Sequence, residues 1–131
     1  MEPHYDAFDR VAGISGKAGN IGGKIVEGGN PFEGPRSNEY PNPPTKQTYA
    51  PTLFAEAARN MGYKPFPVPS ALASQAYTNQ YGVTMGPCTF CGFCTNYGCA
   101  NYSKASAIVN VLPALVRMPN FTAKTHCEVL E

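Results

Sequence analysis

The sequence predicts an α+β fold with two main helices, a few strands and long loops between them. Apolar residues recur at helical spacing in residues 51–61 and 104–117, while residues 24–27 and 121–130 have the composition of strands. The chain also holds 13 glycines and 13 prolines among 131 residues, well above a usual combined share of about 12%. Much of the backbone is therefore expected to lie in loops.

The first fifty residues are the least able to fold alone. Residues 1–12 predict a short helix, with apolar Tyr5, Phe8 and Val11 at helical spacing. Residues 13–50 are loop-like and rich in glycine and proline, with one short strand expected at residues 24–27. Ordering such a segment costs much backbone entropy and buries few apolar side chains. We expect residues 1–50 to pack on a larger body.

Residues 51–61 predict a helix, followed by an extended segment. Pro51 suits a first helical turn and Gly62 suits a helix end. Three alternating prolines then exclude a helix over residues 63–69. The apolar residues that set the helical spacing are Leu53, Phe54, Ala57, Ala58 and Met61.

A second helix is expected from Lys104 to Arg117, with Ser103 as its cap and Pro113 as a point of division. A strand over residues 121–130 then runs to the end of the sequence, which suggests a piece of a larger protein. A rough estimate of the free energy of folding agrees with this. Apolar burial at about 25 cal/mol per Å², set against about 1.5 kcal/mol of ordering entropy per residue, leaves such a chain near zero.

Charge and hydropathy exclude two classes of partner. The net charge is +1, so no strong field favours nucleic acid or an anionic membrane. No apolar run approaches the roughly 20 residues of a transmembrane helix, and the polar N-terminal residues do not form a secretion signal. The compartment, cytoplasmic or periplasmic, stays open.

Four cysteines within twelve residues are the strongest chemical signal in the chain. Their spacing is C-x2-C-x2-C-x4-C, formed by Cys88, Cys91, Cys94 and Cys99. Iron–sulfur ligation is favoured because short loops let backbone amides face the cluster sulfurs. Structural zinc and disulfides remain alternatives, although zinc sites usually use two separated knuckles and two disulfides would be tight here.

No catalytic residue is predicted. The glycine-rich residues 15–23 lack the order of a phosphate-binding loop and follow no strand, so they indicate a place where backbone segments approach closely. His4 and His126 have no partner at ligand or catalytic spacing.

Five segments, in order along the chain, resemble the middle part of bacterial GMC (glucose–methanol–choline) flavoprotein oxidoreductases. Among GMC proteins the likeness is to the gluconate 2-dehydrogenase-like flavoprotein subunits and related sugar or alcohol dehydrogenases. The segments include Gly-Asn-Pro-Phe-Glu-Gly-Pro-Arg-Ser and Cys-Thr-Phe-Cys-Gly-Phe-Cys, and they cover residues 15–21, 29–37, 40–44, 88–94 and 112–129.

This resemblance implies an internal fragment of a two-domain, FAD-binding, Rossmann-like enzyme that oxidises a CH–OH group of a sugar, sugar acid or alcohol. Residues 1–50 would pack on the parent enzyme, and residues 51–131 would belong to its N-terminal FAD-binding region. The isolated fragment is expected to be inactive, because the family's dinucleotide-binding glycine turn and its C-terminal histidine lie outside it.

The resemblance also implies site residues and partners. The backbone of Val129 would contact the adenine of FAD, and Cys88, Cys91, Cys94 and Cys99 match the place of an iron–sulfur centre that relays electrons from the flavin. Their spacing differs from the C-C-x4-C-x3-C pattern of those relatives. The implied partners are the remainder of the flavoprotein, a small subunit and a cytochrome c.

Two alternatives remain at this point. The chain could be a small, non-catalytic metal-binding module, with iron–sulfur or zinc, that packs on a partner. Its cysteine loop could instead be purely structural, held by zinc or disulfides, inside a flavoenzyme.

Overall fold

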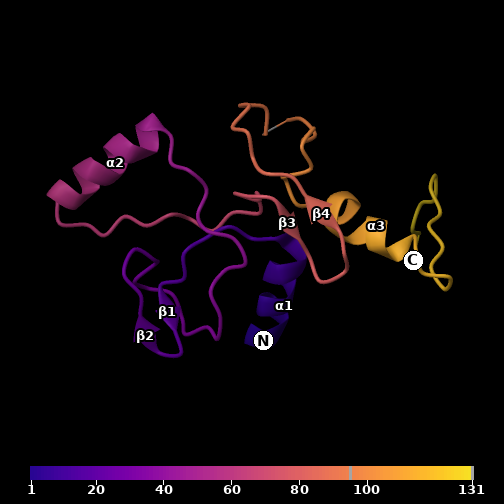
Figure 1. The fold of residues 1–131 in the computed structure, drawn as a ribbon, viewed down its shortest axis with the longest axis horizontal. Helices are drawn as coiled ribbons and strands as arrows, with labels where there is room; N and C mark the ends of the chain where they lie inside the picture. Colours follow the sequence, from indigo (N-terminus) through magenta and orange to yellow (C-terminus); the bar gives the residue numbers. More distant parts are fainter. Residues whose placement is uncertain (95, 131) are drawn as a thin grey trace.

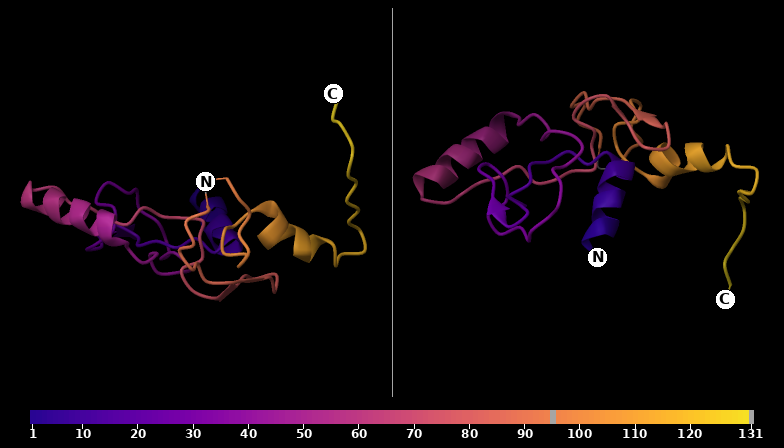
Figure 2. Two further views of the ribbon diagram at one scale, coloured as in Figure 1. Left: turned by 90° about the horizontal axis from the view of Figure 1, so that it is seen from above. Right: turned by 60° about the horizontal axis from the view of Figure 1, so that its bottom comes forward.

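The structure, a computed structural model, describes residues 1–94 and 96–130. Its elements follow in the order α1 (Glu2–Ala12), β1 (Asn20–Ile21), β2 (Lys24–Ile25), α2 (Tyr49–Asn60), β3 (Tyr77–Thr78), β4 (Thr84–Met85), η1 (Ala107–Val111) and α3 (Leu112–Leu115) (Figure 1). The molecule is elongated, with α2 at one end and the C-terminal tail at the other (Figure 2). The predicted mixture of helices and small strands joined by long loops is confirmed for this chain.

Helix α1 confirms the prediction for residues 1–12. A proline lies in its first turn, where no intrahelical N–H is needed, and an ion pair of 2.6 Å joins Arg10 to Asp6 one turn earlier. Gly13 ends the helix in the left-handed conformation, at φ 62°. Tyr5 and Phe8 nevertheless stay mostly exposed.

Helix α2 also forms as predicted, beginning two residues before Pro51. Gly62 follows it at φ 82°, a conformation that favours glycine, so the predicted helix end is confirmed. Within α2 only Ala55 is buried. In Figure 1 the helix stands apart from the other elements.

The second predicted main helix is shorter and less regular than expected. A five-residue π-helix, η1, leads directly into the four-residue α3. Pro113 lies in the first turn of α3, and since proline lacks the N–H for an i→i−4 bond, the helix type changes there. The division at Pro113 is therefore confirmed. The prediction that Ser103 caps this helix is wrong, because the Ser103 hydroxyl donates to the Ala73 carbonyl at 3.1 Å.

Two antiparallel hairpins supply the strands. In the first, Asn20 pairs with Ile25 and Ile21 pairs with Lys24 across a turn of two glycines with positive φ. This hairpin confirms part of the strand expected at residues 24–27. The second hairpin joins β3 to β4 and was not predicted from the sequence.

The strand predicted over residues 121–130 does not form within the described part of the chain, where this segment is an irregular tail. A strand is stable only when its backbone N–H and C=O groups pair with a neighbour. Both hairpins described here contain only their own two strands. The tail has the composition of a strand, but among the described residues no neighbouring strand pairs with it.

The core is small and partly polar. Its buried apolar residues are Ala12, Ile14, Ala18, Ala55, Ala73, Val83, Met85 and Ala114. Five buried polar residues accompany them, namely Ser15, Asn42, Asn79, Ser103 and Asn110. Large apolar side chains remain outside, as with Phe32 at 90% exposure. As expected, the chain alone buries little apolar surface.

Among the described residues, the helices are too short and too polar for any of them to cross a bilayer.

Candidate functional site

The four clustered cysteines lie on a long loop whose two ends are fixed to the same short segment. The N–H of Cys88 donates to the Ala73 carbonyl at 2.8 Å, and the N–H of Ala73 donates to the Ser103 carbonyl at 2.9 Å. Two residues beyond Ser103, the N–H of Ala105 donates to the Ala71 carbonyl at 2.8 Å. Residues 88–103, called here the cysteine loop, therefore leave and rejoin the body at one point.

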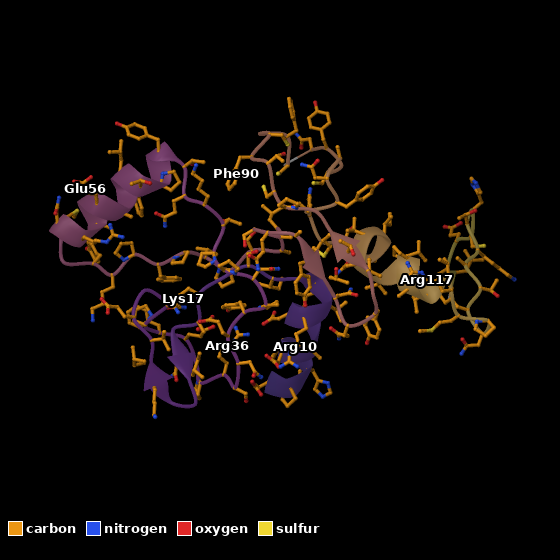
Figure 3. The ribbon with its side chains drawn as sticks, in the orientation of Figure 1. Arg10, Lys17, Arg36, Glu56, Phe90 and Arg117 are labelled. Atoms are coloured by element: carbon orange, nitrogen blue, oxygen red, sulfur yellow. The ribbon has the colours of Figure 1, made fainter. Side chains whose placement is uncertain are left out.

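Within the cysteine loop the backbone turns sharply around Cys91. Its neighbours Phe90 and Gly92 both have positive φ, at 56° and 83°. This conformation is uncommon for phenylalanine. Phe90 lies at the edge of the loop (Figure 3), and Phe93 packs edge-to-face on Tyr97 with ring centroids 5.8 Å apart. The loop thus carries several exposed aromatic side chains beside its thiols.

All four cysteines of the loop are free thiols. Cys88 and Cys99 are half-buried, whereas Cys91 and Cys94 are exposed. Within residues 1–94 and 96–130, no three His, Cys, Asp or Glu side chains converge into an arrangement that could hold a metal ion. The donors suit an iron–sulfur cluster or zinc in kind, since both prefer thiolates. Their geometry does not fit either group without a rearrangement of the loop.

The surroundings of Cys99 favour its thiolate form. The backbone N–H of Lys104 is the main cause that lowers the pKa of the Cys99 thiol, against the opposing effect of burial. The N–H groups of Ser103 and Asn101 and the Lys104 ammonium lower it further. The same ammonium donates to the Cys94 carbonyl at 2.6 Å. The sequence did not predict that Lys104 contributes to this site. Its only signal there is its position, five residues after Cys99.

Val129, expected to contact FAD, lies on the irregular tail and is 92% exposed. Cys127, on the same tail, is exposed and its thiol contacts the Thr125 carbonyl oxygen at 3.3 Å. In Figure 1 the tail lies apart from the cysteine loop, so the two are separate places rather than one site. The role of Val129 stays a prediction.

The glycine-rich segment forms a close contact between two backbones. A Cβ added to Gly19 would collide with the backbone of Asn30, and one added to Gly29 would collide with that of Ala18. The N–H of Ala18 donates to a Glu39 carboxylate at 2.6 Å, and the N–H of Gly19 donates to Glu33 at 2.5 Å. Carboxylates of the chain itself thus occupy these amides. The prediction of a close-approach loop rather than a phosphate loop is confirmed.

Arg36 fastens this loop to α1 (Figure 3). Its guanidinium lies 2.7 Å from Asp9, 3.5 Å from Glu33 and 3.8 Å above the Tyr40 ring. Burial, together with the hydrogen bond from its hydroxyl to Glu33, raises the pKa of Tyr40 to about 12. Asp9, which bonds to Arg36, is 27 residues away in sequence, so spacing gave no signal of this cluster. Its role here is structural.

Comparison with known proteins relates the chain to flavoprotein dehydrogenases and oxidases. It is 47% identical over 133 residues to the gluconate 2-dehydrogenase flavoprotein of Pantoea cypripedii, which covers 99% of this chain and 22% of that protein. It is 28% identical over 130 residues to the paromamine 6'-oxidase of Streptomyces fradiae, covering 99% of this chain and 20% of the relative.

A third relative is the 6'''-hydroxyparomomycin C oxidase of Streptomyces lividus, 26% identical over 130 residues and covered to 21% of its length. The chain thus spans about a fifth of the length of these relatives. No family model matches the chain, and no solved structure matches it.

Proposed function

We propose that the chain is part of a longer, GMC-type, FAD-dependent oxidoreductase that oxidises a CH–OH group of a sugar, sugar acid or alcohol. The observation that carries this proposal is the 47% identity, across 99% of the chain, to a gluconate 2-dehydrogenase flavoprotein. The two oxidases support the broader class, because their similarity also extends over 99% of the chain. The core is consistent with a part that relies on a larger body, since it is made mainly of small and polar residues.

In the whole enzyme the bound flavin would supply the redox chemistry by accepting hydride, while protein groups bind and orient it. This chain's contribution would be the Val129 backbone, placed against the adenine. That role requires the tail to pair with a strand from the rest of the polypeptide, because Val129 is 92% exposed here. Residues 1–50 would pack on the same body.

For the cysteine loop we propose an iron–sulfur relay, with Cys88, Cys91, Cys94 and Cys99 as ligands. The chemistry of the donors supports this, since thiolates are the ligands of such clusters. The lowered pKa of Cys99 favours the thiolate form that binds metal. Because the four thiols do not converge in this structure, the proposal requires the loop to close as the cluster forms. A small subunit would be a further partner, and a cytochrome c would accept the electrons.

The experiment compares the full-length polypeptide that contains this chain with single cysteine variants, all purified without oxygen. Flavin absorbance, iron and sulfide content, and electron paramagnetic resonance are measured on each. C91S and C94S should lose the cluster signal and keep the flavin. The matched control C127S, which alters an exposed cysteine of the tail, should keep both.

Each part of the proposal can fail separately. A full-length protein without flavin would overturn the assignment to flavin-dependent oxidoreductases. A flavin-containing protein without iron and sulfide would remove the relay and leave the zinc or disulfide alternative for the loop. If the isolated 131-residue chain folds cooperatively only with added metal, the non-catalytic metal-binding module becomes the better function.

A further inference from the structure

The apolar side of α2 and the segments beside it form an unfilled, positively charged surface. We call it the α2 face and define it by Phe32, Phe54, Ala58, Arg59, Tyr63 and Lys64. Two adjoining hollows of about 630 and 680 Å³ lie on it, between the loop after β2 and the chain that leaves α2. Phe32, Phe54 and Tyr63 are 90%, 73% and 65% exposed.

Helix α2 needs a packing partner that the described residues do not provide. It contacts no other helix or strand among them, and Figure 2 shows it extending away from the body. A helix of 12 residues is marginal in water by itself, and most helical stability comes from packing an apolar face. The α2 face is therefore a surface that something covers.

Charge defines what can cover the α2 face. Arg59 and Lys64 both line the hollows, and neither has an ion-pair partner within the described part of the chain. Among the described residues that line the same hollows, Glu27, two residues after β2, is the only carboxylate. The occupant must therefore present apolar side chains for the aromatic rings together with carboxylates for the two cations.

A second copy of the chain does not meet this requirement. In a two-fold dimer the same patch meets itself, so the surface that carries Arg59 and Lys64 would face a second surface with the same two cations. Like charges brought together in that way cost free energy. A segment of the same polypeptide is favoured instead, because about four fifths of the length of the relatives lies outside the matched region. Covalent linkage also gives such a segment a high effective concentration.

We propose that the α2 face is the docking site for an apolar segment bearing Asp or Glu that belongs to the same polypeptide and lies outside these 131 residues. This inference rests on the proposed function, which makes the chain part of a longer flavoprotein. It specifies where one of the contacts between the chain and that larger protein lies and which kinds of side chain form it.

Photo-crosslinking in the full-length polypeptide tests the proposal. Phe54 is replaced by the photoreactive analogue benzoylphenylalanine, and the linked peptides are identified by mass spectrometry. A second protein carries the analogue at Tyr63, in case the first does not fold. Isotopically light and heavy copies are mixed so that links within one chain are distinguished from links between copies.

The expected product is a link within one chain to a peptide outside these 131 residues that contains Asp or Glu, lost when the protein is unfolded in urea. K64E should remove most of this product, whereas the control K46E, at an exposed lysine outside the α2 face, should leave it unchanged. A light–heavy link, a link to another protein, or no link in either folded protein overturns the proposal. Flavin absorbance is recorded separately, so that a failure of the proposed function is distinguished from a failure of this docking.

Discussion

Replacing Asn79 with alanine should open the β3–β4 hairpin, because this buried amide joins three parts of the fold. Asn79 is 4% exposed. Its Nδ2 donates to the carbonyls of Val11 and Asn110 at 3.2 and 3.0 Å. Its Oδ1 accepts from the N–H groups of Tyr81 and Val83 at 3.0 and 3.1 Å. The end of α1, η1 and the turn between β3 and β4 thus meet on one side chain.

The magnitude follows from these four hydrogen bonds. Each contributes about 0.5–1.5 kcal/mol net, and buried groups left without a partner add to the loss, so N79A should destabilise the hairpin by about 3–4 kcal/mol. Since 1.4 kcal/mol is about a factor of ten, local opening should become on the order of 10²–10³-fold more frequent. N79D keeps the acceptor, but it turns a carboxylate oxygen toward the carbonyls of Val11 and Asn110 and buries a charge, so its effect should be at least as large as that of N79A.

Amide hydrogen exchange measures local opening in a protein of any size. Peptides covering residues 77–85 of the full-length protein are compared among the parent protein, N79A and N79D. The matched control is N38A, which removes an exposed amide bonded to a single carboxylate and should change stability by less than about 0.5 kcal/mol. If N79A leaves exchange over residues 77–85 within tenfold of the parent, the amide does not hold the hairpin as argued.

Two further predictions concern the glycine-rich loop. G19A should destabilise the protein by about 1–3 kcal/mol through overpacking, because its Cβ would meet the rigid backbone of Asn30. Gly34 faces open space, so the control G34A should change stability by less than about 0.5 kcal/mol. Equal melting temperatures for the two variants would refute the close contact. Burial opposes ionisation of Glu39, but backbone N–H donors, Ala18 among them, hold the pKa of its carboxyl below the usual 4.5. The stabilisation is therefore present above about pH 4.5 and is lost as the pH falls through the lower folded value, so exchange of the Ala18 amide, corrected for its intrinsic rate, should rise on acidification in the parent and not in E39Q.

Local chemistry explains which elements were predictable. Helix α1, helix α2 and the turn at Gly62 depend on apolar spacing, proline and glycine, which act over a few residues. The division at Pro113 depends on one missing N–H in the same way. The β3–β4 hairpin was missed because Asn79 and Met85 hold it from inside the fold, through contacts that strand composition does not reveal.

In the candidate site, too, local features were predictable from the sequence and long-range contacts were not. Spacing alone identified four thiols able to share a metal, but whether they converge depends on the loop, and here they do not. The contribution of Lys104 to the surroundings of Cys99 also comes from the way the loop rejoins the body.

The sequence by itself determined helices α1 and α2 and where they end, a close-approach glycine loop and a cluster of thiols, because each depends on neighbours a few residues apart. Only the tertiary structure decided that residues 121–130 have no strand to pair with, and that Arg36 fastens the glycine-rich loop to α1. It also decided that α2 leaves an apolar, cationic face open. These outcomes depend on which distant groups meet, and burial and hydrogen bonding between distant segments are set by the whole fold rather than by local propensity.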